Sequence, residues 1–305
     1  MNSVNTNPYN LPSDAVLMLP RPIVTGCSSG IGREIASLIA SKPNLRLIAT
    51  ARDISSLSYL PDDTSNVFKV ELNVTSVDSI DAAFVAAAKH FGENFYLDVA
   101  VNNAGYSLSG DTESATEEEI NQEMQTLFFG TARVTMRAIG VMRQHKEHRG
   151  GLIFNISSLA GLIGLPGHAY YHAAKFAVEG FSESVAREVH PDWNINICIV
   201  EPSGVKTNFE GHSKARTKPH PAYAAKDMPA RKLEFYVNMG IKSGVGMLAP
   251  SSIADSLFAI ADRGERVPLR LPLGPTAWKM GKSKFEGLLG EWDAVKELSF
   301  MGKEA

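Results

Sequence analysis

Cysteine is scarce in this chain of 305 residues, because Cys27 and Cys198 are its only two and they lie far apart. Two cysteines in apolar surroundings make no disulfide framework, which indicates a reducing compartment. No apolar run approaches the length of about 20 residues that a membrane-spanning helix needs. The first 16 residues have neither a basic start nor an apolar core, so they are unlike a signal peptide. These absences predict a cytoplasmic protein with no membrane span.

An excess of charge of one sign is also missing. The 30 Lys and Arg residues nearly balance the 33 Asp and Glu residues, the net charge is −3, and both signs are interspersed. A chain without a basic stripe has little to attract nucleic acid or an anionic membrane. His145, His148 and His190 lack the spacing of metal ligands. We therefore expect neither a nucleic-acid partner nor a bound metal.

What the sequence does have is a regular alternation of short apolar runs and longer segments of helical period. The apolar runs that read as strands lie at 23–25, 45–50, 67–72, 97–101, 152–156, 194–200 and 267–273. Strands that alternate with helices predict an α/β fold with a doubly wound parallel sheet. On length the chain could hold one domain or two, but the unbroken alternation favours a single domain over 17–305. A polar N-terminal extension at 1–16 precedes it.

The first strand runs into a glycine-rich turn, TGCSSGIG, at residues 25–32. Gly26, Gly30 and Gly32 suit a tight turn, a close approach of backbone to a pyrophosphate, and the packing of a helix on a strand. Such a turn is weak evidence alone and strong evidence between a strand and a helix. We expect dinucleotide binding by residues of this turn, namely Gly26, Ser28, Ser29, Gly30, Ile31 and Gly32.

The stretch from Gly151 to Glu188 carries the candidate catalytic residues. Tyr171 and Lys175 are four residues apart in a predicted helix, so they lie on one face of it. A lysine ammonium beside a phenol stabilises the phenolate, which suits the phenol to exchange a proton with a carbonyl or alcohol oxygen. Ser158, at the end of the preceding strand, is placed to donate a hydrogen bond to the same oxygen. Tyr170 points elsewhere.

Tyr-x-x-x-Lys alone would also fit a packed tyrosine beside a solvated lysine. Here, however, Ser158 precedes Tyr171 by thirteen residues, and TGCSSGIG and NNAG (102–105) stand upstream in that order. Over roughly residues 20–275 this set resembles the short-chain dehydrogenase/reductase family. The resemblance implies a seven-stranded Rossmann sheet of strand order 3-2-1-4-5-6-7 that binds a nicotinamide cofactor. It adds to Tyr171 and Lys175 a further set of cofactor-binding residues, Asn73, Val74, Asn103, Ala104, Gly105, Pro202, Val205 and Thr207.

The resemblance has implications for the rest of the chain as well. It implies a substrate lid at about 209–248. The sequence pattern itself predicts a C-terminal helix at about 275–300, and we expect its Trp278 and Leu288 to close the pocket. The resemblance also implies a homodimer or homotetramer, paired through the helices that start near Glu117 and Tyr170. The lid is rich in Lys and Arg. An anionic substrate is one interpretation, but solvated charges on a mobile segment are the interpretation that we favour.

Arg52, just past the second strand, bears on the choice of cofactor. NAD-preferring members of the family carry an acidic residue where this chain has Ala51, and Arg52 is able to pair with a 2′-phosphate. Asp53 comes one residue too late for the ribose. We therefore predict NADP(H) rather than NAD(H), the alternative being that Arg52 is a surface charge.

Leu127 is the main departure from the family pattern, which places an asparagine three residues before Gly130. The predicted function is an NADPH-dependent oxidoreductase that interconverts a ketone or aldehyde and an alcohol, with Tyr171 as general acid and base. One alternative, which Leu127 suggests, is a cofactor-bound enzyme without net redox chemistry, such as a dehydratase, isomerase or cyclase. The other is an NADPH-sensing binding protein, and the intact Ser158, Tyr171 and Lys175 argue against it.

Overall fold

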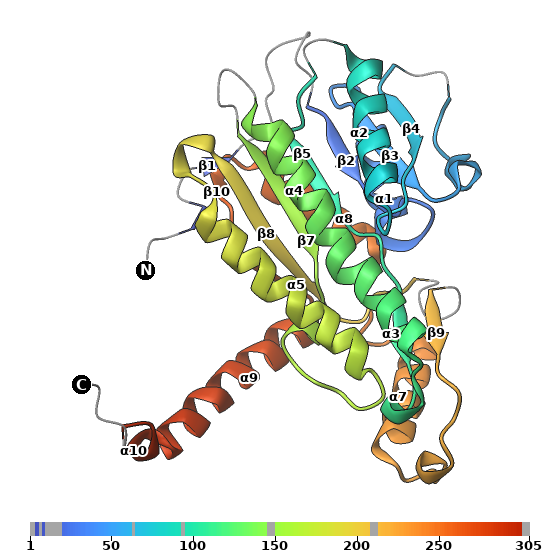
Figure 1. The fold of residues 1–305 in the computed structure, drawn as a ribbon, viewed down its shortest axis with the longest axis vertical. Helices are drawn as coiled ribbons and strands as arrows, with labels where there is room; N and C mark the ends of the chain where they lie inside the picture. The colour runs from blue at the N-terminus through green and yellow to red at the C-terminus, as the bar shows by residue number, and fades with distance from the viewer. Residues whose placement is uncertain are drawn as a thin grey trace.

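A parallel sheet of seven strands forms the centre of the molecule, in the order β11-β8-β7-β5-β2-β3-β4 (Figure 1). The computed structural model describes residues 4–5, 8–9, 20–62, 65–92, 95–144, 150–207 and 213–300. The strands are β2 (Pro22–Val24), β3 (Leu47–Ala51), β4 (Val67–Glu71), β5 (Val99–Asn102), β7 (Gly151–Ile156), β8 (Ile195–Pro202) and β11 (Arg270–Leu273). Counted along the chain, this order confirms the predicted doubly wound sheet.

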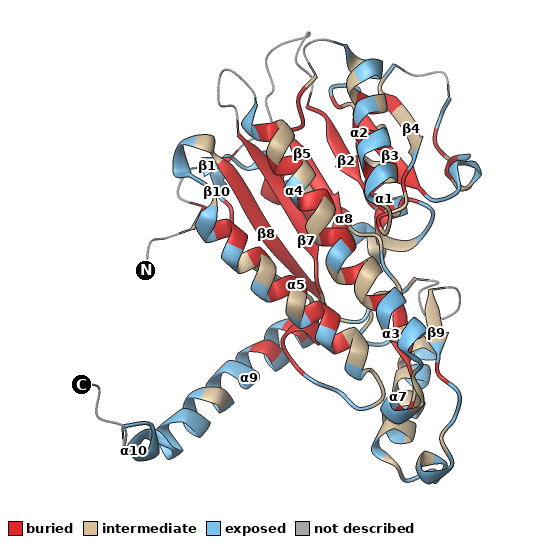
Figure 2. Cartoon of the chain, viewed as in Figure 1, coloured by how far each residue is buried: buried red, intermediate tan, exposed pale blue. Residues whose placement is uncertain are grey.

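Helices cover both faces of the sheet, which is why its strands read as continuous apolar runs. One face packs against α1 (Gly30–Ala40) and α8 (Pro250–Asp262), and the other against α2 (Val77–Phe91), α4 (Gly130–Arg143) and α5 (Ala169–Glu188). Neighbouring residues of one strand serve opposite faces: Val24 joins the first core and Ile23 the second. Figure 2 shows the central strands buried between these layers.

The segment predicted as one amphipathic helix at 117–144 contains a widened turn. It consists of α3 (Glu117–Met124), a π-helical turn η3 (Gln125–Phe129) and α4. A capping box starts α3, because Thr116 and Glu119 each accept a backbone N–H bond from the other residue. The π turn holds Leu127, which is 1% exposed. Such turns are rare and occur frequently at functional sites.

Short elements complete the body. Part of the predicted N-terminal extension packs against it, since β1 (Pro8–Tyr9) pairs with β10 (Glu265–Arg266) and the Tyr9 side chain is buried. The Tyr9 hydroxyl donates to the Asp98 carbonyl oxygen at 2.8 Å. The short helical turns are η1 (Ile54–Leu57), η2 (Thr112–Ser114), η4 (Leu159–Gly161), η5 (Pro191–Trp193) and η6 (Pro221–Tyr223).

The segments at 213–243 and 275–300 are built more loosely than the core. β9 (Lys214–Arg216) pairs with β6 (Ser107–Ser109), and α7 (Pro229–Ser243) follows without a single buried residue. These elements occupy the predicted lid, of which residues 209–212 lie outside the described part of the chain. α9 (Pro275–Ala294) and α10 (Lys296–Ser299) extend away from the body toward the C-terminus (Figure 1). Trp278 on α9 is 56% exposed.

Candidate active site

The glycine-rich turn lies where β2 ends, at the edge of the sheet where all its parallel strands have their carboxyl ends. Gly26 and Gly30 have φ angles of +72° and +57°, which favour glycine. A Cβ atom on Gly32 would lie 2.3 Å from the Gly26 carbonyl oxygen. Ser29 precedes α1, and its side chain makes no capping hydrogen bond within the described residues. The first N–H groups of α1 are therefore open to a phosphate.

The NNAG segment is built directly onto this turn. The backbone N–H groups of Asn103 and Ala104 both donate to Thr25 Oγ1, at 2.9 and 3.0 Å. The Asn103 amide nitrogen donates to the Thr25 carbonyl oxygen at 3.0 Å. A Cβ atom on Gly105 would lie 2.7 Å from Leu127 Cδ2. Two predicted cofactor motifs thus form one rigid unit, and Gly105 also makes room for Leu127.

Ser158, Tyr171 and Lys175 come from β7 and α5, which follow one another in the chain. Lys175 Nζ lies 5.8 Å from the centre of the Tyr171 ring and donates to the Ile156 carbonyl oxygen at 2.8 Å. Ser158 Oγ accepts a hydrogen bond from the Ala160 N–H group at 3.1 Å, which leaves the hydroxyl hydrogen for another acceptor. The Lys175 side chain therefore ties the helix to the strand end that carries Ser158.

Lys175 is an unusual place for a positive charge, because its side chain is buried. Burial lowers the pKa of this lysine to about 8, and the carboxylates of Glu123 and Glu179 limit the fall. An amine of that pKa changes its charge near neutral pH. Perturbed titrating groups at the end of a parallel sheet mark a candidate catalytic site.

A buried acidic cluster behind Lys175 was not predicted from the sequence. Glu179 lies one helical turn beyond Lys175, and Glu201 lies near the end of β8. Arg270 Nε stands 3.3 Å from a Glu179 carboxylate oxygen and 3.5 Å from one of Glu201. Burial and the neighbouring Glu179 raise the pKa of Glu201 to about 8. Glu179 could have been predicted, because it lies four residues after Lys175 on the same helix. Nothing in the sequence around Glu201 indicates that it joins this cluster.

The residues expected to meet the far end of the cofactor lie around the ends of β3 and β4. Arg52 is exposed directly after β3. Asp53 is the N-cap residue of η1, and its carboxylate accepts a hydrogen bond from the Ser55 N–H group at 2.9 Å. This carboxylate therefore already has a partner within the protein. The Asn73 amide oxygen, expected to accept from adenine, here accepts two bonds from Thr75, at 2.9 and 3.1 Å. Val74 packs beside Gly130.

Residues after β8 return to the same edge. Pro202 ends the strand, and Val205 bridges to Leu248 at the end of the lid. Thr207 lies over the glycine-rich turn, since a Cβ atom on Gly30 would be 3.4 Å from Thr207 Cγ2. Predicted cofactor residues from distant parts of the chain therefore surround one turn.

Comparison with known proteins agrees with this geometry. Residues 22–218 match the family described as short chain dehydrogenase. The chain belongs to the short-chain dehydrogenase/reductase family. The oxidoreductase calM of Penicillium decumbens is 62% identical over 299 residues, which cover 98% of this chain and 96% of that protein.

Solved structures of short-chain dehydrogenases share the fold. A short-chain dehydrogenase from Streptomyces avermitilis has a TM-score of 0.79 and 30% identity, covering 92% of this chain and 98% of its own. An alcohol dehydrogenase from the archaeon Thermococcus sibiricus, complexed with 5-hydroxy-NADP, has a TM-score of 0.66 and 22% identity. The alignment with this archaeal protein covers 85% of the present chain and 98% of its own. The present chain is therefore an oxidoreductase of this family.

In the described part of this short-chain dehydrogenase, no helix is both long and apolar enough to span a bilayer. No three His, Cys, Asp or Glu side chains gather there as a set of metal ligands.

His172, next to Tyr171, is buried and serves the loop that follows Ser158. Its Nε2 accepts the Leu165 N–H bond at 3.1 Å, so the ring proton lies on Nδ1, which donates to the Ala160 carbonyl oxygen at 2.8 Å. Burial lowers the pKa of His172, and this favours the neutral ring. His172 therefore fixes the loop that follows Ser158, although its place beside Tyr171 in the sequence suggests acid–base chemistry.

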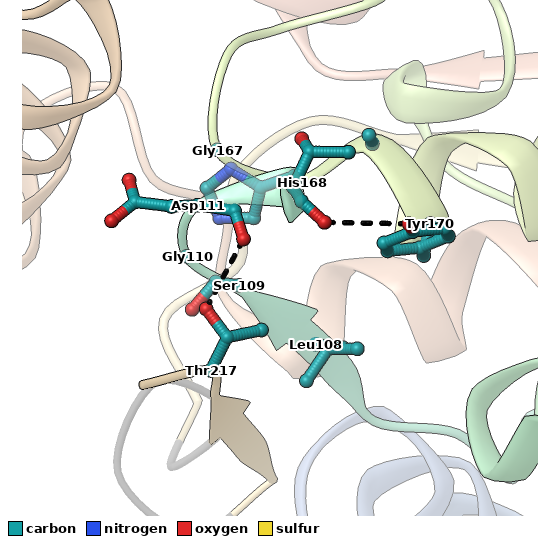
Figure 3. Close-up of a pocket in the computed structure, with 10 residues that line it drawn as sticks. Leu108, Ser109, Gly110, Asp111, Gly167, His168, Tyr170 and Thr217 are labelled. Atoms are coloured by element: carbon teal, nitrogen blue, oxygen red, sulfur yellow. Dashed lines mark hydrogen bonds between the residues drawn. The ribbon is translucent and has the colours of Figure 1, made fainter. Parts of the chain in front are cut away.

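The lid joins the body through residues 107–112. Asp111 is buried, and one of its carboxylate oxygens accepts from Arg231 of α7 at 2.5 Å and from the His220 N–H group at 2.9 Å. Figure 3 shows the junction of this segment with Thr217 and the turn at Gly167. The cavity among them is about 10 Å³, no more than a water needs. Tyr170 belongs to this junction, because its hydroxyl donates to the Thr112 carbonyl oxygen at 3.3 Å.

Proposed function

We propose that this chain is an NADPH-dependent reductase of ketones or aldehydes that also runs in reverse as an alcohol dehydrogenase. The observation that carries the proposal is the placement of Lys175, a buried amine held between Tyr171 and the strand end bearing Ser158. A merely structural lysine on α5 would reach solvent, as most lysines do. Burying this one costs free energy, which a role in proton transfer explains.

The residues at the sheet edge fit a dinucleotide. The glycine-rich turn leaves no space for side chains at Gly26 or Gly32, while the first N–H groups of α1 are uncapped. Gly26, Ser28, Ser29, Gly30, Ile31 and Gly32 would hold the pyrophosphate, and Asn103, Pro202, Val205 and Thr207 the nicotinamide half. The bound cofactor supplies or accepts the hydride.

The side chains of the protein handle the proton. Ser158 donates its hydroxyl hydrogen to the carbonyl oxygen of the substrate and polarises the bond. Tyr171 gives its phenolic proton to that oxygen as negative charge develops on it. The Lys175 ammonium stabilises the phenolate that remains, and solvent later restores the proton. In the reverse direction each proton moves the opposite way.

Arg52 supports the choice of NADPH. It is exposed at the end of β3, and no acidic side chain stands at Ala51 to hold a ribose hydroxyl. The neighbouring Asp53 is occupied by Ser55. A guanidinium there would pair with the 2′-phosphate that only NADPH carries.

Absorbance of the reduced cofactor tests the proposal on the wild-type chain. NADPH and NADH are each offered with a panel of lipid, steroid-like, sugar and polyketide ketones. We expect NADPH to be consumed with at least one of them, and faster than NADH. Product formation without a change in absorbance would favour a dehydratase, isomerase or cyclase, and NADPH binding without any product would favour a sensor.

We also propose that the chain forms a homodimer or homotetramer through α4 and α5. Phe129 and Phe176 are 41% and 45% exposed, and Met136 on α4 is 53% exposed. Exposed apolar groups on neighbouring helices suit an isologous interface. Light scattering at micromolar concentration should give at least twice the monomer mass, and a monomer would contradict the proposal.

The proposed compartment is the cytoplasm. Cys27 and Cys198 are buried free thiols. Burial raises the pKa of Cys27 to about 12, which makes it an inert apolar filler inside the glycine-rich turn. A reducing compartment suits such a chain.

A further inference from the structure

Glu123 is a fully buried carboxyl group that the proposed mechanism does not yet use. It lies in the last turn of α3, four residues before Leu127, and its exposed fraction is 0%. Glu118 on the same helix is exposed. An ionisable side chain without access to water costs free energy unless something compensates it. Its position therefore calls for a partner.

Among the described residues, only one oxygen of this carboxyl group has a hydrogen-bond partner. Glu123 Oε1 accepts the Leu108 N–H bond of β6 at 2.7 Å. The other oxygen, Oε2, is buried and finds no hydrogen bond among the residues that the structure describes. A structural acceptor for Leu108 needs one oxygen, which an amide would supply. The second oxygen points to a role that requires charge.

Lys175 is the cation whose charge acts on Glu123, because it opposes the rise in the pKa of this carboxyl group. The helix α3 packs against both β6 and α5, the elements that carry Leu108 and Lys175. An ammonium has three donors, and one of those on Lys175 is spent on the Ile156 carbonyl oxygen. The titratable and charged groups around Glu123 are Lys175 on α5, Tyr106 before β6 and Glu119 on α3, with Lys214 and Arg216 one strand further on β9.

The charges of the two groups depend on each other. Burial raises the pKa of Glu123 to about 7, against the pull of the Leu108 N–H group and of Lys175. Burial lowers the pKa of Lys175 to about 8. The carboxylates of Glu123 and Glu179 oppose this fall, and Glu123 has the larger effect. Each charge therefore favours the other, because the ammonium opposes the rise in the pKa of Glu123 and the carboxylate opposes the fall in the pKa of Lys175.

We propose that Glu123 is a positioning residue of the active site, whose carboxylate keeps the buried Lys175 in the ammonium form that proton transfer at Tyr171 requires. The proposal rests on the function proposed above. Glu123 would thus supply a charged group near the active site, which the apolar side chain of Leu127 in the next turn cannot supply. The proposal also predicts that activity depends on the ionisation of both groups.

The decisive variant is Glu123→Gln, which keeps an oxygen for the Leu108 N–H bond and removes the charge. We expect kcat at pH 8 to fall by about tenfold or more, with KM for the carbonyl substrate changed less than about threefold. In the wild type, kcat should rise with pH through about 7 and fall through about 8. In the variant the rise should disappear and the fall should move to lower pH.

Two further variants separate charge from packing. Glu123→Asp retains the carboxylate on a shorter side chain, so it should restore part of the kcat and the rise with pH. Glu118→Gln makes the same chemical change at an exposed site of α3, so it should behave as wild type. A Glu123→Gln profile that superposes on the wild-type profile overturns the proposal.

Thermal unfolding gives a test that needs no turnover. A carboxyl group whose folded-state pKa is raised stabilises the fold fully below its unfolded-state pKa, and this stability is lost as pH rises through the folded-state value. From pH 5 to pH 8, Tm of the wild type should therefore fall relative to Tm of Glu123→Gln. If the wild type proves catalytically inactive, this difference still decides the claim about Glu123. Parallel Tm curves would overturn it.

Discussion

The edge of the sheet is packed far more closely than the two segments at 213–243 and 275–300. At the sheet edge, backbone and side chains of the glycine-rich turn, the NNAG segment and Thr25 interlock, so that an added methyl group at Gly32 would lie 2.3 Å from an oxygen. In the other two segments, α7 has no buried residue and α9 buries only Ala277 and Gly281. Our proposals place the chemistry at the sheet edge, and they leave the choice of substrate to the loosely packed segments.

The two regions meet through very few side chains. Asp111 and Arg231 form the main buried contact, and Tyr223 adds a hydrogen bond to Glu113. If the segment acts as the predicted lid, we expect it to open at little cost in free energy. The basic residues of the lid are partly accounted for, because Arg216 and Arg231 are paired within the protein.

Gly32→Ala should have the largest effect on cofactor binding, because the added methyl group would clash with backbone atoms of the glycine-rich turn that cannot move without a large cost in free energy. We expect NADPH affinity to fall by at least about 10²-fold, or the chain to lose its cooperative melt. Gly290→Ala in α9 is the matched change in the loose region, where nothing lies within 4 Å. It should be neutral, or stabilise the helix by up to about 1 kcal/mol. Fluorescence titration and circular dichroism would measure both, and equal effects would refute the comparison.

Arg52→Ala tests an exposed position beside the rigid edge. Loss of one charge-assisted contact to the 2′-phosphate costs about 1.5–3 kcal/mol, so NADPH should bind about 10- to 100-fold more weakly. NADH binding is the internal control and should not change. If the wild type already prefers NADH, the assignment of Arg52 is wrong.

Arg231→Gln should loosen the lid and leave the sheet edge intact. The substitution removes the charged donor to Asp111, which is worth about 1.5–3 kcal/mol. We expect cleavage between α7 and the body by a dilute protease to become about tenfold faster or more, with KM raised and kcat almost unchanged. Lys232→Gln, an exposed neighbour, serves as the control. Unaltered proteolysis of Arg231→Gln would show that the lid is held elsewhere.

Leu127→Asn should have only a modest effect on turnover. Leucine keeps the backbone carbonyl that the family asparagine also offers, and its side chain packs against Gly105. The variant should change kcat by less than about tenfold, or 1.36 kcal/mol of barrier. A much larger rise in kcat would mean that Leu127 blocks reduction in the native chain. The favoured function would then be an enzyme without net redox chemistry.

Sequence reasoning worked wherever the determinants were local. The alternation of strands and helices, the glycine-rich turn and the placement of Tyr171 and Lys175 on one helix follow from period and spacing within a few residues. The strand order came instead from the resemblance to the family. Sequence reasoning missed the burial of Glu123 and the Glu201–Arg270 contact, because these depend on which elements pack together far apart in the chain. It also missed α7, whose apolar residues are exposed and give no buried stripe to detect.

The reductase assignment rests on Tyr171, and its neighbour Tyr170 provides an internal control. Tyr171→Phe removes the transferable proton and keeps the ring, whereas Tyr170→Phe removes a hydroxyl whose bond goes to the Thr112 carbonyl oxygen. With NADPH and an accepted ketone, kcat of Tyr171→Phe should fall by at least about 10²-fold with NADPH affinity retained. The kcat of Tyr170→Phe should stay within about threefold of wild type, as expected for a substitution outside the chemistry. Near-normal reduction by Tyr171→Phe would contradict the account.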